Sequence, residues 1–153
     1  MVPLRRISDT ANAKIYKLPA GASTAQLFLE DSSSLRGIDG ITFLDGALYV
    51  NNVISSKLYR IPVDAAGKAG QPVEISLDQP VNRPDGMRAA NGKLLVAENG
   101  SGKISVITVN GDKATVTVIK EGLKTPTAVE PAGDTIWIAE RGAGKAVSIP
   151  MPK

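Results

Sequence analysis

The sequence of 153 residues predicts an all-β protein, a partial β-propeller of about three and a half four-stranded blades. Three observations predict this fold. A unit of 42 to 46 residues recurs along the chain, and each unit divides into short apolar segments bounded by glycine, proline and asparagine turns. No stretch of about 12 residues has the 3.6-residue periodicity of a helix. Because a lone blade would leave both of its apolar faces in water, successive blades must stack on one another.

The repeat is clearest between residues 38–61 and 84–107, which align without a gap at an offset of 46. Residues 126–149 align with residues 84–107 at an offset of 42, again without a gap. Near the N-terminus, residues 14–19 (KIYKLP) match residues 57–62 (KLYRIP) at an offset of 43. The N-terminal copy lacks its beginning, so the chain is expected to start within a blade.

The expected strands divide a single domain, residues 1–153, into four units. Residues 4–30 supply three strands, residues 38–77 and 84–121 supply one full blade each, and residues 126–150 supply the first three strands of a last blade. Closed propellers have about four to eight blades. The chain is therefore expected to be roughly half of a six-bladed propeller, or to close a ring by self-association. Open ends expose strand edges and apolar faces, so we expect a homo-oligomer or a complementing half-propeller.

The composition removes several classes of function. Eighteen Lys and Arg against fifteen Asp and Glu give a net charge of +3, and the basic residues are scattered, so nucleic acid is not an expected partner. The absence of cysteine and histidine excludes disulfides, thiolate and imidazole metal ligands, and a Ser-His-Asp triad. Any catalysis must therefore use carboxylates, Lys, Tyr or a metal held by oxygen ligands.

No apolar run approaches the roughly 18 residues of a membrane-spanning helix, and residues 1–6 lack the apolar core of a signal peptide. We therefore expect a soluble protein with no membrane partner. The compartment stays open between the cytoplasm and, with a leader absent, the periplasm or the exterior.

A candidate site follows from the position of two acidic residues in the repeat. Asp39, Asp85 and Thr127 are equivalent and stand at the entrance to the first strand of three blades, which lines the channel of a propeller. Two carboxylates and a hydroxyl converging there would suit calcium or another hard cation. Such an ion can polarise a carbonyl or activate water without histidine. The alternative is a structural role, because Asp-Gly is a common turn pair and an Asp at a strand entry often only accepts hydrogen bonds from nearby backbone amides.

Three further residues are interpreted as structural. Glu98 and Glu140 follow strand ends at matching positions near Lys or Arg, and are interpreted as solvated loop charges, with a place on the channel rim as the alternative. Trp137 replaces Leu95 in the repeat and is interpreted as a core filler between blades.

A family resemblance rests on residues 83–107 (RPDGMRAANGKLLVAENGSGKISVI), followed by residues 125–140 (TPTAVEPAGDTIWIAE). These stretches resemble the C-terminal half of the regucalcin and gluconolactonase-like family of six-bladed propellers, whose most recognisable motif is PDG, a strand, GKLWVA, a glycine loop and a strand. The resemblance implies a divalent metal, usually calcium, that assists lactone hydrolysis at the channel mouth. It makes Asp85 a metal ligand and candidate base, and places Asp39 where the family has an asparagine ligand. The family's remaining acidic ligand belongs to its first blade, which the resemblance does not cover.

Two functional hypotheses result, and the sequence leaves open whether the chain is an enzyme. In the first, the chain is half of a calcium-dependent lactone (ester) hydrolase, in which Asp39 and Asp85 bind the metal and Asp85 is the catalytic residue that accepts a proton. Its ligand would be a small lactone or a sugar-acid-like molecule. In the second, the propeller is a non-catalytic binding or scaffold module, which the lack of histidine and the incomplete set of metal ligands favour.

Overall fold

The computed structural model describes residues 4–153, which contain fourteen β-strands and one short 3-10 helix. In chain order the strands are β1 (Arg5–Asp9), β2 (Lys14–Leu18), β3 (Gln26–Glu30), β4 (Ile38–Leu44), β5 (Ala47–Asn52), β6 (Leu58–Pro62), β7 (Val73–Leu77), β8 (Pro84–Ala90), β9 (Lys93–Glu98), β10 (Lys103–Asn110), β11 (Lys113–Lys120), β12 (Pro126–Ala132), β13 (Thr135–Glu140) and β14 (Lys145–Pro150). The helix η1 (Arg141–Ala143) lies between β13 and β14. Within these described residues, no helix has the length and apolar character that crossing a membrane requires.

The strands form three sheets, ordered β1-β2-β3, β4-β5-β6-β7-β11-β10-β9-β8 and β12-β13-β14. Neighbouring strands are antiparallel except β7 and β11, which pair in parallel through Ser76 with Lys113 and Leu77 with Ala114. The eight-stranded sheet is therefore two four-stranded blades, β4–β7 and β8–β11, joined along their outer strands. The repeat matches β1–β3 to β5–β7 and β12–β14 to β8–β10, so the first sheet lacks the inner strand of a blade and the last sheet lacks the outer one.

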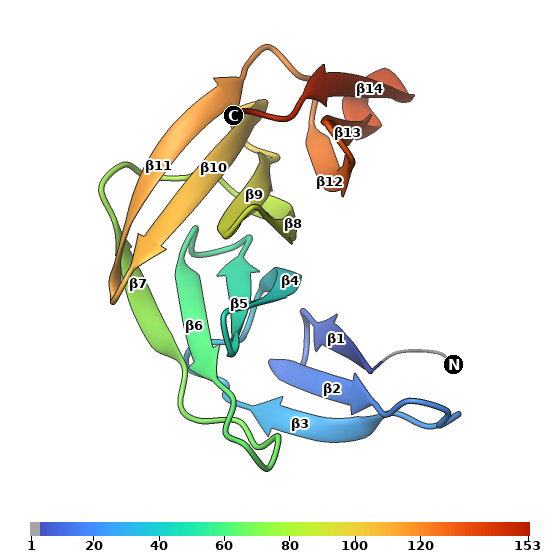
Figure 1. Ribbon diagram of the computed structural model, residues 1–153, viewed down its shortest axis with the longest axis vertical. Helices are drawn as coiled ribbons and strands as arrows, with labels where there is room; N and C mark the ends of the chain where they lie inside the picture. Colours follow the sequence, from blue (N-terminus) through green and yellow to red (C-terminus); the bar gives the residue numbers. More distant parts are fainter. Residues whose placement is uncertain (1–3) are drawn as a thin grey trace.

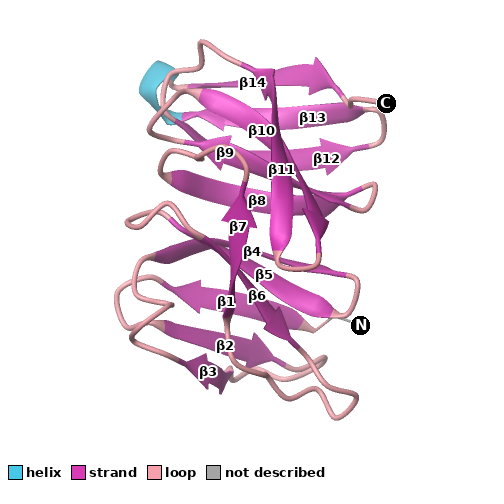
Figure 2. Cartoon of the chain, turned by 90° about the vertical axis from the view of Figure 1, so that its left-hand side faces the viewer, coloured by secondary structure: helices cyan, strands magenta, loops and turns pink. Residues whose placement is uncertain are grey.

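The sheets follow one another along a crescent (Figure 1). The strands β4, β8 and β12, which we call the inner strands, lie on its concave side together with β1, while β3, β7 and β11 lie on its convex side (Figure 1). The view turned by 90° shows the sheets stacked along the long axis of the molecule (Figure 2). These features confirm the prediction of an all-β partial propeller.

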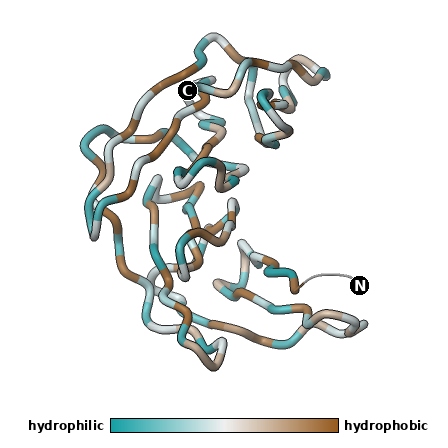
Figure 3. Tube along the Cα trace, viewed as in Figure 1, coloured by the Kyte–Doolittle hydropathy of each residue, from teal (hydrophilic) through white to brown (hydrophobic). Residues whose placement is uncertain are grey.

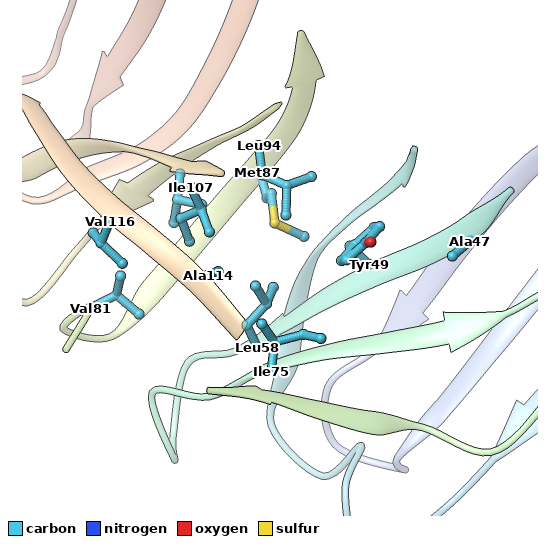
Figure 4. Packing of buried hydrophobic residues seen from close by; sticks show 11 residues of the cluster. Ala47, Tyr49, Leu58, Ile75, Val81, Met87, Leu94, Ile107, Ala114 and Val116 are labelled. Atoms are coloured by element: carbon cyan, nitrogen blue, oxygen red, sulfur yellow. The ribbon is translucent and has the colours of Figure 1, made fainter. Parts of the chain in front are cut away.

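The core consists of three apolar clusters, one between each pair of successive blades. In the middle cluster, Tyr49 and Leu58 of one blade meet Met87 and Ile107 of the next (Figure 4). Successive side chains of a strand point to opposite faces, so each blade contributes to the cluster before it and to the cluster after it. Apolar stretches accordingly follow the strands, while the connecting turns are mostly polar (Figure 3).

The interpretation of Trp137 as a core filler was wrong. Its side chain is 51% exposed, whereas the equivalent Tyr49 and Leu95 are 6% and 2% exposed. Tyr49 and Leu95 each face a following blade. Trp137 is exposed because it lies on the last sheet, β12-β13-β14, which no other sheet within residues 4–153 covers on that side.

Candidate functional site

The three residues predicted from the sequence lie within the inner strands, and not just before them as expected. Each is the second residue of its strand: Asp39 in β4, Asp85 in β8 and Thr127 in β12. Gly40 and Gly86 follow the two aspartates within the strands, and neither has a positive φ. The Asp-Gly pairs are therefore strand residues and do not form turns.

Each of these strand starts carries a β-bulge. In β4 the register with β5 passes from Ile38 opposite Asn52 to Ile41 opposite Val50, which leaves Asp39 and Gly40 together opposite a single residue. The register of β8 with β9 shifts in the same way, between Pro84 and Met87. A bulge bends the strand and redirects a side chain, and bulges are common beside binding sites.

The glycines after the two aspartates allow neighbouring inner strands to approach closely. A Cβ atom on Gly86 would lie 2.7 Å from the backbone oxygen of Thr127, and a Cβ atom on Gly40 would collide with the backbone oxygen of Asp85. Only glycine has no Cβ and so tolerates such contacts. The Gly of each Asp-Gly pair therefore sets the distance between successive inner strands.

A buried amide fixes the position of the two acidic strands. The Gly40 N–H donates a 2.9 Å hydrogen bond to Oδ1 of Asn51 on β5, and Nδ2 of Asn51 donates a 2.8 Å bond to the backbone oxygen of Asp85. Ser8 of β1 occupies the equivalent place in the preceding sheet, and its hydroxyl donates a 2.7 Å bond to the backbone oxygen of Asp39. The backbones that carry Asp39 and Asp85 are thus held by the preceding blade.

The carboxyl groups of Asp39 and Asp85 lie beside one another. Burial, the hydrogen bond with Asp39 and the charge of Asp39 together raise the pKa of Asp85 to about 7, against the lowering effect of the Arg141 charge and of a hydrogen bond from Asn99. That bond runs from Nδ2 of Asn99 to Oδ2 of Asp85 over 3.3 Å. Asp85 therefore retains its proton up to about neutral pH.

Sequence reasoning missed Asn99 and Arg141, although the 42-residue offset aligns the two residues. Each is the first residue after the second strand of its blade, β9 or β13. The backbone N–H of Arg141, at the start of η1, donates to the backbone oxygen of Thr125 over 3.1 Å. Its side chain is exposed and makes no ion pair within residues 4–153, so the guanidinium is the positive group beside the acidic pair.

The interpretation of Glu98 and Glu140 as solvated charges was also wrong, because both are buried. Alternate residues of β9 and β13 face the preceding blade, and both glutamates fall on that side. Glu98 accepts hydrogen bonds from the backbone N–H of Asn82 at 2.9 Å and from the hydroxyls of Ser101 and Ser105. Within residues 4–153, the one ion pair of the Glu140 carboxylate is with Lys145, at 3.7 Å.

The structure brings Asp39 and Asp85 together but makes no hydrogen bond between either carboxyl group and the hydroxyl of Thr127. Within residues 4–153, no three Asp, Glu, His or Cys side chains are grouped so that they could hold a metal ion. We call the end of the channel where Asp39 and Asp85 lie the mouth. The oxygen donors at the mouth are therefore two carboxyl groups, with the side-chain amide of Asn99 beside them.

No family model matches the sequence, and no curated protein matches it either. Among solved structures, virginiamycin B lyase from Staphylococcus aureus is 22% identical with a TM-score of 0.67 over 92% of this chain, and a candidate gluconolactonase is 18% identical with a TM-score of 0.67 over 90%. The fold is that of a β-propeller. An auxiliary nutrient binding protein from Bacteroides thetaiotaomicron is also similar, with 10% identity and a TM-score of 0.74 over 94% of this chain. The chain spans 46%, 45% and 44% of these three propellers, so it corresponds to less than half of each.

Proposed function

We propose that this half-propeller carries part of the site of a lactone (ester) hydrolase that depends on calcium or another divalent metal. The observation that carries the proposal is the contact between Asp39 and Asp85 at the mouth. Similarity to a candidate gluconolactonase supports it at the level of the fold. The substrate class would be small lactones, whose ring opening produces a hydroxy acid.

The donor set fits a hard cation in part. A cation between Asp39 and Asp85 would offset the repulsion between the two carboxylates and the cost of burying their charge, which raise the pKa of Asp85. Carboxylates are also preferred ligands of calcium. When bound, such an ion supplies a Lewis acid that polarises the ester carbonyl and orients water. Because calcium takes about six to eight oxygen ligands, water, substrate or residues outside this chain would supply the others.

The side chains of this chain would have three tasks in such a reaction. The Asp85 carboxylate would accept the proton of the attacking water. Asn99 donates to Oδ2 of Asp85 and orients that carboxyl group. The Arg141 guanidinium, whose charge acts on Asp85, would bind the carboxylate that forms when the ring C–O bond breaks and the proton passes to the leaving oxygen.

A calcium titration followed by thermal unfolding and by calorimetry tests the metal site directly. We expect calcium to raise the melting temperature of the protein and Asp85→Asn to abolish that rise. Asp45→Asn is the matched control, since Asp45 is an exposed aspartate in the turn at the opposite end of β4. An unchanged melting temperature at millimolar calcium would contradict a metal site in this chain.

Turnover is tested with a series of aliphatic and sugar lactones, followed by release of acid. We expect weak calcium-dependent hydrolysis that Asp85→Asn removes and Asp45→Asn preserves. The proposal fails as a hydrolase if calcium binds at Asp85 and no lactone in the series is opened faster than in buffer.

A second candidate is a binding module without catalysis. It is favoured by the absence of a third acidic metal ligand within residues 4–153 and by the structural similarity to a nutrient binding protein. A sugar acid that binds without being converted, and whose binding is lost in Arg141→Ala, would favour this candidate over the hydrolase.

A further inference from the structure

Four exposed basic side chains stand at the mouth end of the sheets, beside the inner strands. Arg36 and Lys124 lie two residues before β4 and β12, and Arg83 directly precedes β8. Arg141 directly follows β13 and begins η1, which marks this end of the sheets in Figure 2. None of the four makes an ion pair within residues 4–153.

Other charged residues at this end already have partners. Lys57, Lys103 and Lys145 are equivalent in the repeat, and each forms an ion pair with a glutamate. Asp31 accepts a hydrogen bond from the hydroxyl of Ser33. The unpaired positive charge therefore gathers beside the inner strands, where the acidic pair lies.

The backbone of Arg83 is held by two neighbouring loops. Its N–H donates a 3.0 Å hydrogen bond to the hydroxyl oxygen of Ser56 in the preceding blade. Its carbonyl oxygen accepts a 3.1 Å bond from the N–H of Asn99, whose side chain donates to Asp85. The entrance to β8 is therefore fixed, with Arg83 two residues before Asp85.

Arg83 also occupies a backbone conformation that glycine would adopt more easily. Its φ is 48°, and the equivalent residue one blade earlier is a glycine, Gly37, with a φ of 93°. Strained backbone of this kind clusters at ligand-binding and active sites. A long basic side chain at such a position favours a role for the guanidinium in binding.

Lys124 and Arg141 lie on two loops that are hydrogen-bonded to each other. The N–H of Gly142, next to Arg141, donates a 3.0 Å bond to the carbonyl oxygen of Lys124. The charge of Arg141 acts on Asp85, which places these loops beside the entrance to β8. Arg83, Lys124 and Arg141 therefore approach the acidic pair from two neighbouring blades.

We propose that the mouth binds a sugar acid or lactone that carries a phosphate group, and that Arg83 and Lys124 bind this phosphate. A phosphate monoester carries about two negative charges near pH 7 and has three acceptor oxygens. Arginine binds such a group through two parallel hydrogen bonds, and lysine binds it as a point charge. Arg141 alone suffices for one carboxylate, so the further basic residues call for a second anionic group on the same ligand.

This proposal rests on the proposed site at Asp85 and adds a substrate class to it. The phosphate would anchor the ligand and direct its carboxylate or lactone carbonyl toward Arg141 and Asp85. The two proposals fail separately. A calcium effect that Asp85→Asn removes reports on the metal site, whereas a preference for phosphorylated ligands that depends on Arg83 and Lys124 reports on the phosphate site.

Calorimetric titration of the native chain with 6-phosphogluconate, gluconate and inorganic phosphate tests the proposal, with and without calcium. We expect 6-phosphogluconate to bind at least about tenfold more tightly than the other two, because it alone carries both anionic groups on one sugar chain. Equal affinities for gluconate and 6-phosphogluconate would overturn the proposal. Inorganic phosphate that binds as tightly as 6-phosphogluconate would overturn it too, since the sugar acid would then contribute nothing.

Variants of equal charge change then locate the phosphate site. Arg83→Gly removes the guanidinium and relaxes the backbone, so it should lower the affinity for 6-phosphogluconate about tenfold while the melting temperature stays the same or rises. Lys124→Gln should lower the affinity similarly, and neither variant should change gluconate binding.

Lys93→Gln is the matched control, because Lys93 is exposed at the start of β9, at the opposite end of the strand from the mouth, and makes no ion pair within residues 4–153. It should bind 6-phosphogluconate like the native chain. If Arg83→Gly and Lys124→Gln also bind like the native chain, or if they weaken gluconate to the same extent as 6-phosphogluconate, the phosphate site is disproved.

Discussion

The side-chain amide of Asn51 donates a 2.8 Å hydrogen bond to the backbone oxygen of Asp85, across the boundary between two blades. The same side chain accepts a bond from the Gly40 N–H, directly after Asp39. One buried asparagine therefore holds both acidic strands, and the spacing of the Asp39 and Asp85 carboxyl groups depends on it.

Replacing Asn51 should destabilise the protein and disturb the site. Asn51→Leu would leave the buried Gly40 N–H and the Asp85 carbonyl without their partner, at a cost of about 2–3 kcal/mol in the free energy of unfolding. Urea unfolding measures the loss. Asn12→Leu is the control, because Asn12 is exposed and its side chain bonds only Asp9, so a smaller effect is expected. Equal losses in the two variants would contradict the bridging role.

The raised pKa of Asp85 predicts how stability depends on pH. Its folded pKa of about 7 lies above the ordinary value of 3.8, so the native protein binds more protons between these values than the unfolded chain. The stabilising effect of the protonated form is complete below about pH 4 and is lost as the pH rises through 7. Asp85→Asn should therefore be more stable than the natural chain at pH 8, by about 1–2 kcal/mol after allowance for solvent screening of a partly exposed carboxyl.

Melting temperatures of both proteins between pH 5.5 and 8.5, in the presence of a chelator, measure this difference. The gap between the variant and the natural chain should widen with rising pH and level off above pH 8. A constant gap would show that Asp85 does not titrate in this range.

Gly86 should tolerate no side chain. An alanine Cβ there would lie 2.7 Å from the Thr127 backbone oxygen and 2.8 Å from the Ala128 Cα, so Gly86→Ala should cost about 1–3 kcal/mol by forcing β8 and β12 apart. Gly70→Ala is the matched control, since its nearest atoms lie at 3.5 Å and its φ is not positive. Denaturant unfolding of the two variants decides the matter, and a neutral Gly86→Ala would contradict the close approach of the inner strands.

The two buried glutamates should respond differently to the same substitution. Glu98→Gln would weaken hydrogen bonds from the Asn82 N–H and from the hydroxyls of Ser101 and Ser105, with a loss of about 1.5–3 kcal/mol. Glu140→Gln would remove only a 3.7 Å ion pair with the exposed Lys145, for a change below about 1 kcal/mol. Chemical unfolding at constant pH compares them, and a larger loss in Glu140→Gln would reverse the assignment.

The fold could be predicted from the sequence because each blade repeats the same turn and strand pattern, and repetition makes the strand count reliable. The adjacency of Asp39 and Asp85 was predictable for the same reason, since equivalent residues of stacked blades must be neighbours. Their β-bulges were not predictable, because a bulge depends on the register with the neighbouring strand and not on local residue type. Glu98 is buried because its side chain faces the preceding blade, and Trp137 is exposed because no described sheet covers its side. Both outcomes depend on the neighbouring blades, which the residues of a single repeat unit do not reveal.

The parallel pairing of β7 with β11 has a consequence for unfolding. Because Ser76 and Leu77 pair with Lys113 and Ala114, the two central blades share one continuous hydrogen-bonded sheet, whereas β1–β3 and β12–β14 form separate sheets at the ends. Hydrogen exchange should therefore find one cooperative unit over residues 38–120, whose amides exchange only by global opening, flanked by two end sheets that open first and independently. The molecule would lose its ends before it loses its centre, and the inner strands β4 and β8, with both aspartates, belong to the part that unfolds last.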